Sequence, residues 1–225
     1  MMVTLLTNSD LQLIFTKKIF MILYAQSVIS VAFASISFST ESFQYFFKEN
    51  FWLMYLFSGL YTVFSLTPLV LASFRKPPQN DVILFIVILS IIIIDTCAVS
   101  ADPGTVLQTL TFLSSSILGL VVFSLFSYAK ASKIWALVSM ATINILVLLV
   151  LFFVGFQDWG MLVIFLIVGL CFGGYLLVII TDLCDRYSIK NTEISYGTLL
   201  IYADILIIPY IITKIQLFRN KHLIS

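Results

Sequence analysis

The chain has 225 residues, of which 61% are hydrophobic and only 10% are charged, and its formal net charge is +1. A soluble globular domain is about one-quarter charged, so this composition excludes the ordinary soluble class. The small net charge also excludes a broad electrostatic attraction to nucleic acid. Together with a mean hydropathy of +1.11, these values predict a polytopic membrane protein, with the lipid bilayer as its first partner.

Seven apolar stretches follow one another along the chain, and each is long enough to cross a bilayer as a helix, which takes about 20 residues. The stretches are 19–38, 51–73, 82–100, 106–128, 134–156, 160–181 and 195–217. Short connections make consecutive helices antiparallel neighbours. We therefore expect an all-α fold, a seven-transmembrane-helix bundle in which residues 1–225 form a single transmembrane domain.

Basic residues in the connections predict the orientation of this bundle. If the N-terminus is cytosolic, the connections on its side carry eight Lys and Arg residues, and those on the other side carry only Lys48. The eight are Lys17, Lys18, Arg75, Lys76, Lys130, Lys133, Arg186 and Lys190. This bias follows the positive-inside rule. The basic tail 214–225 would then lie outside if the last stretch crosses fully, as we expect, whereas a break at Pro209 would favour a re-entrant hairpin.

The candidate functional residues are carboxylates inside the apolar stretches, because an ionisable group at membrane depth costs about 2.5–3.5 kcal/mol on insertion scales. Asp204 is the first candidate. It lies about nine residues into the last stretch, which is about 14 Å at a rise of 1.5 Å per residue. No Lys or Arg within two turns can pair with it, and Tyr202 is a polar neighbour that could share a small wet pocket. The alternative is a neutral Asp hydrogen-bonded to an adjacent helix.

Asp182 and Asp185 share one helix face at the cytosolic end of the sixth stretch. They could simply be charges at a helix end. If Asp182 approaches Asp204 instead, the two carboxylates cannot both ionise cheaply, so the pair would share a proton at low pH. When deprotonated, the pair would offer hard oxygen ligands, or an open electrostatic path, to Ca²⁺.

Asp95 lies about two-thirds of the way along the third stretch. It could line an outer vestibule, or it could pack against Thr96 and Ser100. On the sixth stretch, Gly169 and Gly173 form a small-xxx-small pair that favours close helix packing. We expect these glycines to bring the sixth helix close to the seventh, and the serines 114–116 to act similarly on the fourth.

Other chemistry has little support in the sequence. Three scattered cysteines and a single histidine, His222, predict no metal site, no cofactor and no catalytic centre. An intramembrane aspartyl enzyme would also use paired Asp residues, but Tyr202-Ala203-Asp204 is only a loose match and no Gly-x-Gly-Asp motif follows it. We therefore expect that the protein is not an enzyme.

Several short motifs occur in a fixed order along almost the whole chain. They are FTKKIFMILYAQSVIS with Lys18, Ile19, Phe20, Leu23, Gln26 and Ser30; DPGTVLQ with Asp102, Val106, Leu107 and Gln108; GGYLLVIITDLCD; and SYGTLLIYADILIIPYI with Leu200, Tyr202, Asp204 and Ile205. Each motif is weak alone. As a set they resemble the Bax inhibitor / Lifeguard superfamily, the transmembrane Bax inhibitor motif proteins.

The resemblance implies a central seventh helix, an Asp182–Asp204 pair acting as a pH-sensitive gate, and a Ca²⁺ leak. It also implies a role in suppressing cell death, with membrane-bound cell-death regulators as partners, in endoplasmic reticulum or Golgi membranes. The chain departs from the family in four respects. No Arg lies between Phe51 and Ser73, and Ser90 stands where Lifeguard-type members have a Glu, which Asp95 could replace a turn and a half later. Pro209 is not part of the family signature, and the family's proline-rich N-terminal extension is not seen. These departures are those of a trimmed, diverged member, and a virus-encoded copy is one origin that would fit them.

Two functions from different classes remain at this point. The first is a pH-sensitive Ca²⁺ leak channel that inhibits apoptosis, with Ca²⁺ as the permeant ion and Asp182, Asp204, Asp95 and Asp185 along the pathway. The second is a non-conducting membrane protein that modulates cell death or trafficking by binding a partner.

Overall fold

The computed structural model describes residues 8–71, 74, 76–126, 133–153, 159–186 and 194–205. Within these ranges the chain is helical and has no strand. The helices are α1 (Asn8–Ser39), α2 (Glu41–Glu49), α3 (Trp52–Val70), α4 (Gln79–Ala101), α5 (Pro103–Phe126), α6 (Lys133–Phe153), α7 (Trp159–Arg186) and a final short helix, Ile194–Ile205.

Six helices are long and apolar enough to cross a membrane: Ile14–Ser39 within α1, then α3, α4, α5, Ile134–Phe153 within α6, and Trp159–Ile180 within α7. The prediction of an all-α, multi-pass membrane fold is therefore confirmed. The described residues do not include a seventh helix long enough to cross the membrane, which the sequence predicted. Ile194–Ile205 is apolar but only about 18 Å long at 1.5 Å per residue, whereas the hydrocarbon core is about 30 Å thick. The rest of that predicted span, 206–217, and Pro209 with it, lies outside the described residues.

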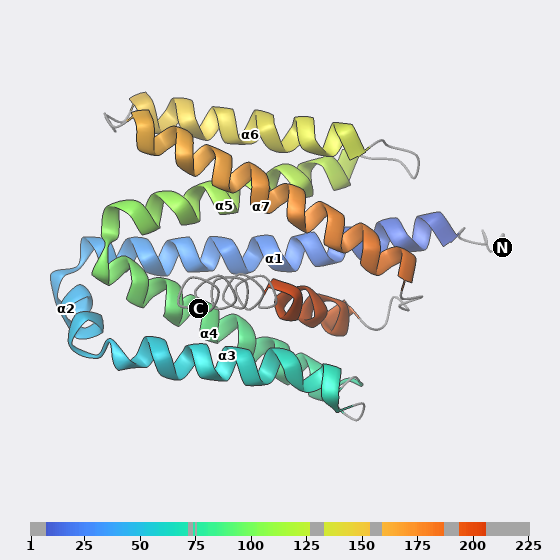
Figure 1. Ribbon diagram of the computed structural model, residues 1–225, viewed down its shortest axis with the longest axis horizontal. Helices are drawn as coiled ribbons and strands as arrows, with labels where there is room; N and C mark the ends of the chain where they lie inside the picture. Colours follow the sequence, from blue (N-terminus) through green and yellow to red (C-terminus); the bar gives the residue numbers. More distant parts are fainter. Residues whose placement is uncertain are drawn as a thin grey trace, which may run out of the picture.

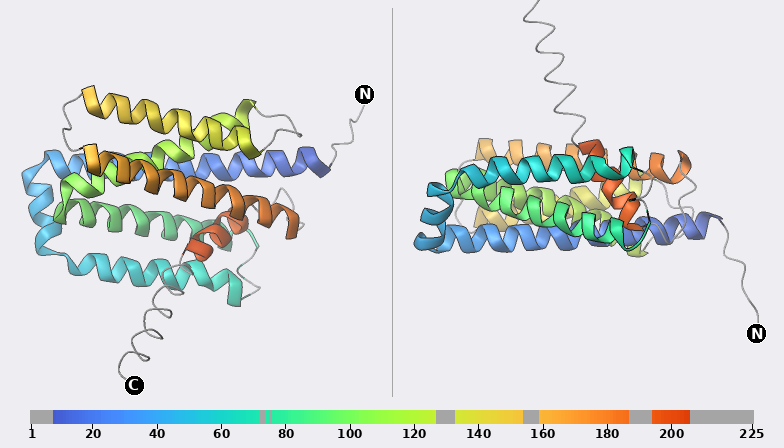
Figure 2. Two further views of the ribbon diagram at one scale, coloured as in Figure 1. Left: turned by 45° about the horizontal axis from the view of Figure 1, so that its top comes forward. Right: turned by 90° about the horizontal axis from the view of Figure 1, so that it is seen from below.

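The helices surround α1, which lies near the middle of the bundle (Figure 1). α4 and α5 both pack against α1; α3 covers α4, and α6 and α7 cover α5. Two further views show the same layers (Figure 2). The largest fully buried side chains along this axis are aliphatic and aromatic, among them Ile19, Phe20, Leu120, Leu176 and Leu199. The final helix Ile194–Ile205 thus contributes to the same core as α1, α5 and α7.

Helix α2 was not predicted. Its sequence, ESFQYFFKE, has charged residues at both ends and aromatic residues between them, and it is too short to span a bilayer. Phe47 is buried, with its ring 5.1 Å from that of Phe43 and 5.3 Å from that of Phe46. α2 packs against α1 and α4 and lies across one end of the bundle (Figure 1). It joins α1 to α3 at that end.

Basic residues are unevenly distributed between the two ends of the bundle, whereas acidic residues lie at both. Among the described residues, the end that contains the start of α1 and the end of α7 carries most of the Lys and Arg residues, and the end that contains α2 and the α4–α5 junction (the two ends are seen in Figure 1) carries Lys48 as its one basic residue. The first end includes Lys17, Lys18, Lys76, Lys133 and Arg186, and the second includes Glu41, Glu49 and Asp102 together with Lys48. The uneven distribution of basic residues is the one that the sequence predicts, and by the positive-inside rule a cytosolic basic end stays a prediction.

A buried polar seam joins α5, α6 and α7. Ser116 Oγ donates to the Gly169 carbonyl at 2.8 Å, and Asn144 Nδ2 donates to Ser116 Oγ at 2.9 Å. A Cβ added at Gly169 would lie 3.0 Å from the Phe112 carbonyl oxygen, and one added at Gly173 would collide with the Met140 side chain. The serines of α5 therefore lie on a face that packs against neighbouring helices, as the sequence predicts.

The prediction for the two glycines was wrong about their neighbour. Gly169 and Gly173 face α5 and α6, and not the final helix. A four-residue spacing identifies one face of a helix, but it does not say which helix packs there. In this bundle the close approach is with the serine-rich face of α5.

Candidate functional site

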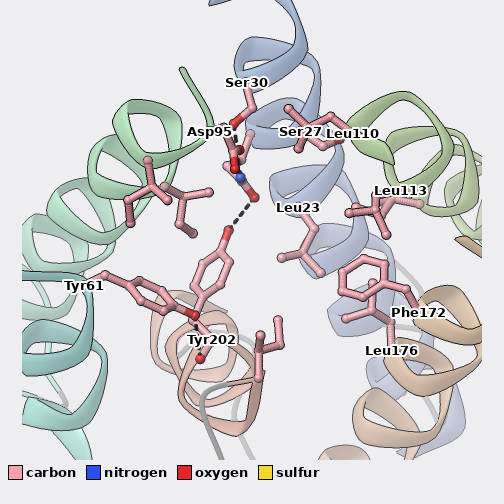
Figure 3. A pocket seen from close by; sticks show the side chains of 15 residues that line it. Leu23, Ser27, Ser30, Tyr61, Asp95, Leu110, Leu113, Phe172, Leu176 and Tyr202 are labelled. Carbon is pink, nitrogen blue, oxygen red and sulfur yellow. Dashed lines mark hydrogen bonds between the residues drawn. The ribbon is translucent and has the colours of Figure 1, made fainter. Parts of the chain in front are cut away.

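A partly open cavity of about 260 Å³ lies between the helices (Figure 3). Its walls come from α1, α3, α4, α5, α7 and the helix Ile194–Ile205. Most of the lining side chains are apolar. The polar ones are Gln26, Ser27 and Ser30 from α1, Tyr61 from α3, Asp95 from α4, and Tyr202 from the final helix.

Asp95 is the carboxylate of this cavity. The neighbouring hydroxyls on α4 are already bonded elsewhere: Thr96 Oγ1 donates to the Ile92 carbonyl at 2.6 Å, and Ser100 Oγ lies 2.8 Å from Ser37 Oγ. The Asp95 side chain is partly buried and interacts with the hydroxyl of Ser30 across the α1–α4 interface (Figure 3). Asp95 therefore lines a cavity, and its place in an outer vestibule, one of the two roles that the sequence left open, stays a prediction.

A chain of hydrogen bonds connects this carboxylate to the final helix. Gln26 Nε2 lies 3.5 Å from Ser30 Oγ, and the Tyr202 hydroxyl donates to Gln26 Oε1 at 3.1 Å. The Tyr61 hydroxyl donates to the Tyr202 carbonyl at 2.8 Å. Figure 3 shows Tyr202 extending from the final helix toward the end of the cavity where Ser30 and Asp95 lie. Four helices are thus joined through polar groups that face one cavity.

The final helix is held by contacts at both of its described ends. Near its start, the Ser195 hydroxyl donates to the Asp81 carboxylate at the beginning of α4. Near its end, the Tyr175 hydroxyl of α7 donates to the Asp204 carbonyl at 3.1 Å. Asp204 itself is partly buried, and it is not among the residues that line the cavity. The structure therefore gives Asp95, and not Asp204, the position facing the cavity.

For the other two candidate carboxylates the structure describes the backbone only. Asp182 and Asp185 lie in the last turns of α7, and their side chains fall outside the described part of the structure. Whether Asp182 meets Asp204 therefore remains a prediction. Among the residues whose side chains the structure describes, Asp95 is the one carboxylate that lines the cavity.

Sequence reasoning did not assign functional roles to four polar residues of the site. Gln26, Ser27 and Ser30 lie on one face of α1 at helical spacing, inside an otherwise apolar stretch. That spacing was a usable signal, because polar side chains in a membrane helix usually face the bundle interior. Tyr61 gave no such signal, since one Tyr in an apolar helix can equally face lipid.

The electrostatics of the cavity favour a cation. No Lys, Arg or His is among the described residues that line it, so Asp95 has no basic partner there. Ca²⁺ in a protein cage takes six to eight oxygen ligands, and no group of three His, Cys, Asp or Glu side chains occurs among the described residues. The arrangement can therefore attract a cation, but it does not build a tight metal cage.

These features define the class of the molecule as a multi-pass helical membrane protein with a carboxylate facing a partly open cavity. No protein-family model matches the chain, and no curated protein or solved structure shows significant similarity to it.

Proposed function

We propose that the protein is a membrane Ca²⁺ leak channel whose cation pathway passes through the cavity beside Asp95. The observation that carries this proposal is a carboxylate facing a cavity among membrane-spanning helices, with no basic side chain among the described residues that line the cavity. A charged group at this depth is expensive, so its position is functional by default. A weakly liganding carboxylate suits a leak, since conduction requires that an ion leaves its site as readily as it enters.

The choice of Ca²⁺ rests on the motif resemblance to the Bax inhibitor / Lifeguard superfamily. The same resemblance supports residence in the Golgi or endoplasmic reticulum and inhibition of apoptosis, through lower filling of the Ca²⁺ store. In this proposal Asp182 and Asp185 lie toward the cytosolic end of the pathway and Asp204 lies deeper, and Asp182 with Asp204 contributes to a pH-sensitive gate. Residues 51–73 contain no Arg, so in this proposal no basic side chain of that segment pairs with the gate carboxylates.

The proposed leak depends on pH in one direction. A protonated carboxyl carries no charge and attracts a cation weakly, whereas the deprotonated form attracts it strongly. Leak should therefore rise as pH rises through the titration of the pathway carboxylates. If Asp204 belongs to the gate, Asp204→Asn should flatten this dependence.

The experiment is Ca²⁺ efflux from proteoliposomes that contain the purified chain, measured over a range of pH against protein-free vesicles. We expect efflux above that of the empty vesicles and increasing with pH. Efflux equal to that of empty vesicles at neutral pH would contradict the leak and favour the alternative, a non-conducting protein that acts by binding a membrane partner. An unchanged pH profile in Asp204→Asn would remove that residue from the gate and leave Asp95 as the titrating group.

A further inference from the structure

The cavity combines two properties that a pathway for a bare metal ion does not need. One wall is polar, with Asp95 and Ser30 side by side, and the other walls are apolar, with Leu113, Phe172 and Leu176 grouped on a different side (Figure 3). Ligand sites are typically apolar concavities with a few placed polar groups that fix orientation. The division of the cavity into a carboxylate end and an apolar body matches that description.

The size of the cavity limits the ligand. An engineered apolar cavity of about 150 Å³ binds benzene, so a cavity of about 260 Å³ can hold one six-membered ring and a short arm. The arm must end in a group that the polar wall can recognise. Gln26 Oε1 already accepts from Tyr202, and Ser30 Oγ lies 3.5 Å from Gln26 Nε2, which leaves the Asp95 carboxylate as the main acceptor for a donor.

The charge of the cavity determines the charge of the ligand that it can bind. A carboxylate without a basic partner among the described lining residues is complemented by a cation, and an ammonium donates up to three hydrogen bonds while requiring no oxygen cage. The side chains of Tyr61, Phe172 and Tyr202 also line the cavity and offer aromatic surface to the body of such a ligand. A carboxylic acid or phosphate would be repelled by the same wall.

We propose that this cavity binds a small lipophilic amine, with its ammonium on Asp95 and its apolar body against Leu113, Phe172 and Leu176. Such a molecule partitions into the bilayer and can reach a site between membrane helices. This inference goes beyond the proposed Ca²⁺ leak, and it stands whether or not the cavity conducts ions.

Two probes of nearly equal size and shape test it: cyclohexylmethylamine, which is a cation near neutral pH, and cyclohexylmethanol, which is neutral. The readout is the thermal unfolding midpoint of the purified full chain in detergent as each probe is titrated, since a ligand that binds only the folded state raises this midpoint. We expect the amine to raise the midpoint at concentrations at least tenfold lower than the alcohol requires. Equal effects of the two probes on the parent protein would overturn the proposal.

Variants locate the site. Asp95→Asn keeps the side-chain volume and should weaken amine binding at least tenfold, so that the two probes become equivalent. Asp102→Asn makes the same chemical change at an exposed residue at the end of α4 and should bind the amine like the parent. A preserved preference for the amine in Asp95→Asn would place the site elsewhere.

A second variant decides the question if Asp95→Asn does not fold. Leu113→Phe keeps the carboxylate and fills part of the apolar wall. Amine binding should fall at least fivefold in this variant. Binding of the amine at parental strength in Leu113→Phe would overturn the cavity as the site.

Discussion

At the scale of single residues, Tyr202 makes two of the polar contacts that join the final helix to the bundle. Its hydroxyl donates to Gln26 on α1, its carbonyl accepts from Tyr61 on α3, and its ring lies 6.5 Å from the ring of Tyr61 in an edge-on arrangement. The side chain is 2% exposed. A buried hydroxyl of this kind matters mainly because its loss leaves the partner's acceptor unsatisfied.

Tyr202→Phe tests this role. The substitution keeps the ring contact and removes only the donor to Gln26 Oε1, so we expect it to lower the free energy of unfolding by about 1–3 kcal/mol. Tyr55→Phe is the matched control, because Tyr55 is 71% exposed, and it should change stability by less than about 0.5 kcal/mol. Denaturation of the purified variants in detergent measures both. Equal stability of the two variants would show that the Tyr202–Gln26 contact contributes nothing.

The sequence identified Asp95 as a carboxylate in the membrane but ranked Asp204 above it. Depth along a helix can be counted from the sequence, and on that measure Asp204 is the more central residue of its stretch. Which side of a helix faces a cavity depends on contacts with residues that are distant in the sequence. Ser30 and Tyr202 supply those partners here, and no local pattern relates them to Asp95.

At the scale of helices, the contact between α5 and α6 depends on the absence of a side chain at Gly119. A Cβ at this position would collide with the backbone of Met140, and Ser139 Oγ donates to the Gly119 carbonyl at 2.9 Å. Small residues that allow backbones to approach closely are the usual basis of helix packing in membranes.

Gly119→Ala should therefore separate the two helices. Backbone atoms cannot yield as a flexible side chain can, and we expect a loss of about 1–3 kcal/mol in stability from overpacking. Gly174→Ala makes the same change on α7 where no atom lies within 4 Å of the new Cβ, so it should be neutral or stabilising by up to about 1 kcal/mol through helix propensity. Thermal unfolding in detergent compares the pair. A Gly119→Ala variant as stable as Gly174→Ala would contradict the close packing of α5 on α6.

The helices themselves were largely predictable. Long apolar runs have one stable form in a membrane, because every backbone polar group must be bonded within the segment, so the predicted stretch 82–100 became Gln79–Ala101 and 134–156 became Lys133–Phe153. α2 was missed because its nine residues are amphipathic and too short for a membrane signal. Its position depends on Phe47 being buried, which is a tertiary contact.

At the scale of the whole molecule, the uneven distribution of basic residues between the two ends predicts how the bundle sits in the membrane. Basic residues gather at the end with the start of α1, and Lys48 is the one basic residue that the described part of the chain places at the end with α2. This arrangement was predictable from the sequence, because the charge of each connection is read directly and its side follows from counting helices. The number of crossings was not, since the described part of the last stretch is a short helix.

Tags at three positions test the orientation. A tag at the N-terminus should be cytosolic, and a tag inserted at Asn50, between α2 and α3, should lie on the opposite side. A tag after Ser225 should share the side of the Asn50 tag if the last stretch crosses fully, and the side of the N-terminus if it re-enters. Protease protection in sealed membranes reports all three. Finding the N-terminal and Asn50 tags on one side would contradict the proposed orientation.

The most direct test of the account is Ca²⁺ flux through purified, reconstituted protein in which only the cavity carboxylate is changed. Asp95→Asn should reduce efflux from proteoliposomes at least fivefold at neutral pH, since it removes the charge that draws a cation into the cavity and keeps the side-chain volume. Asp102→Asn, the same change at an exposed position outside the cavity, should leave efflux at the parental rate. Parental efflux in both variants, with both folded, would contradict a cation pathway beside Asp95.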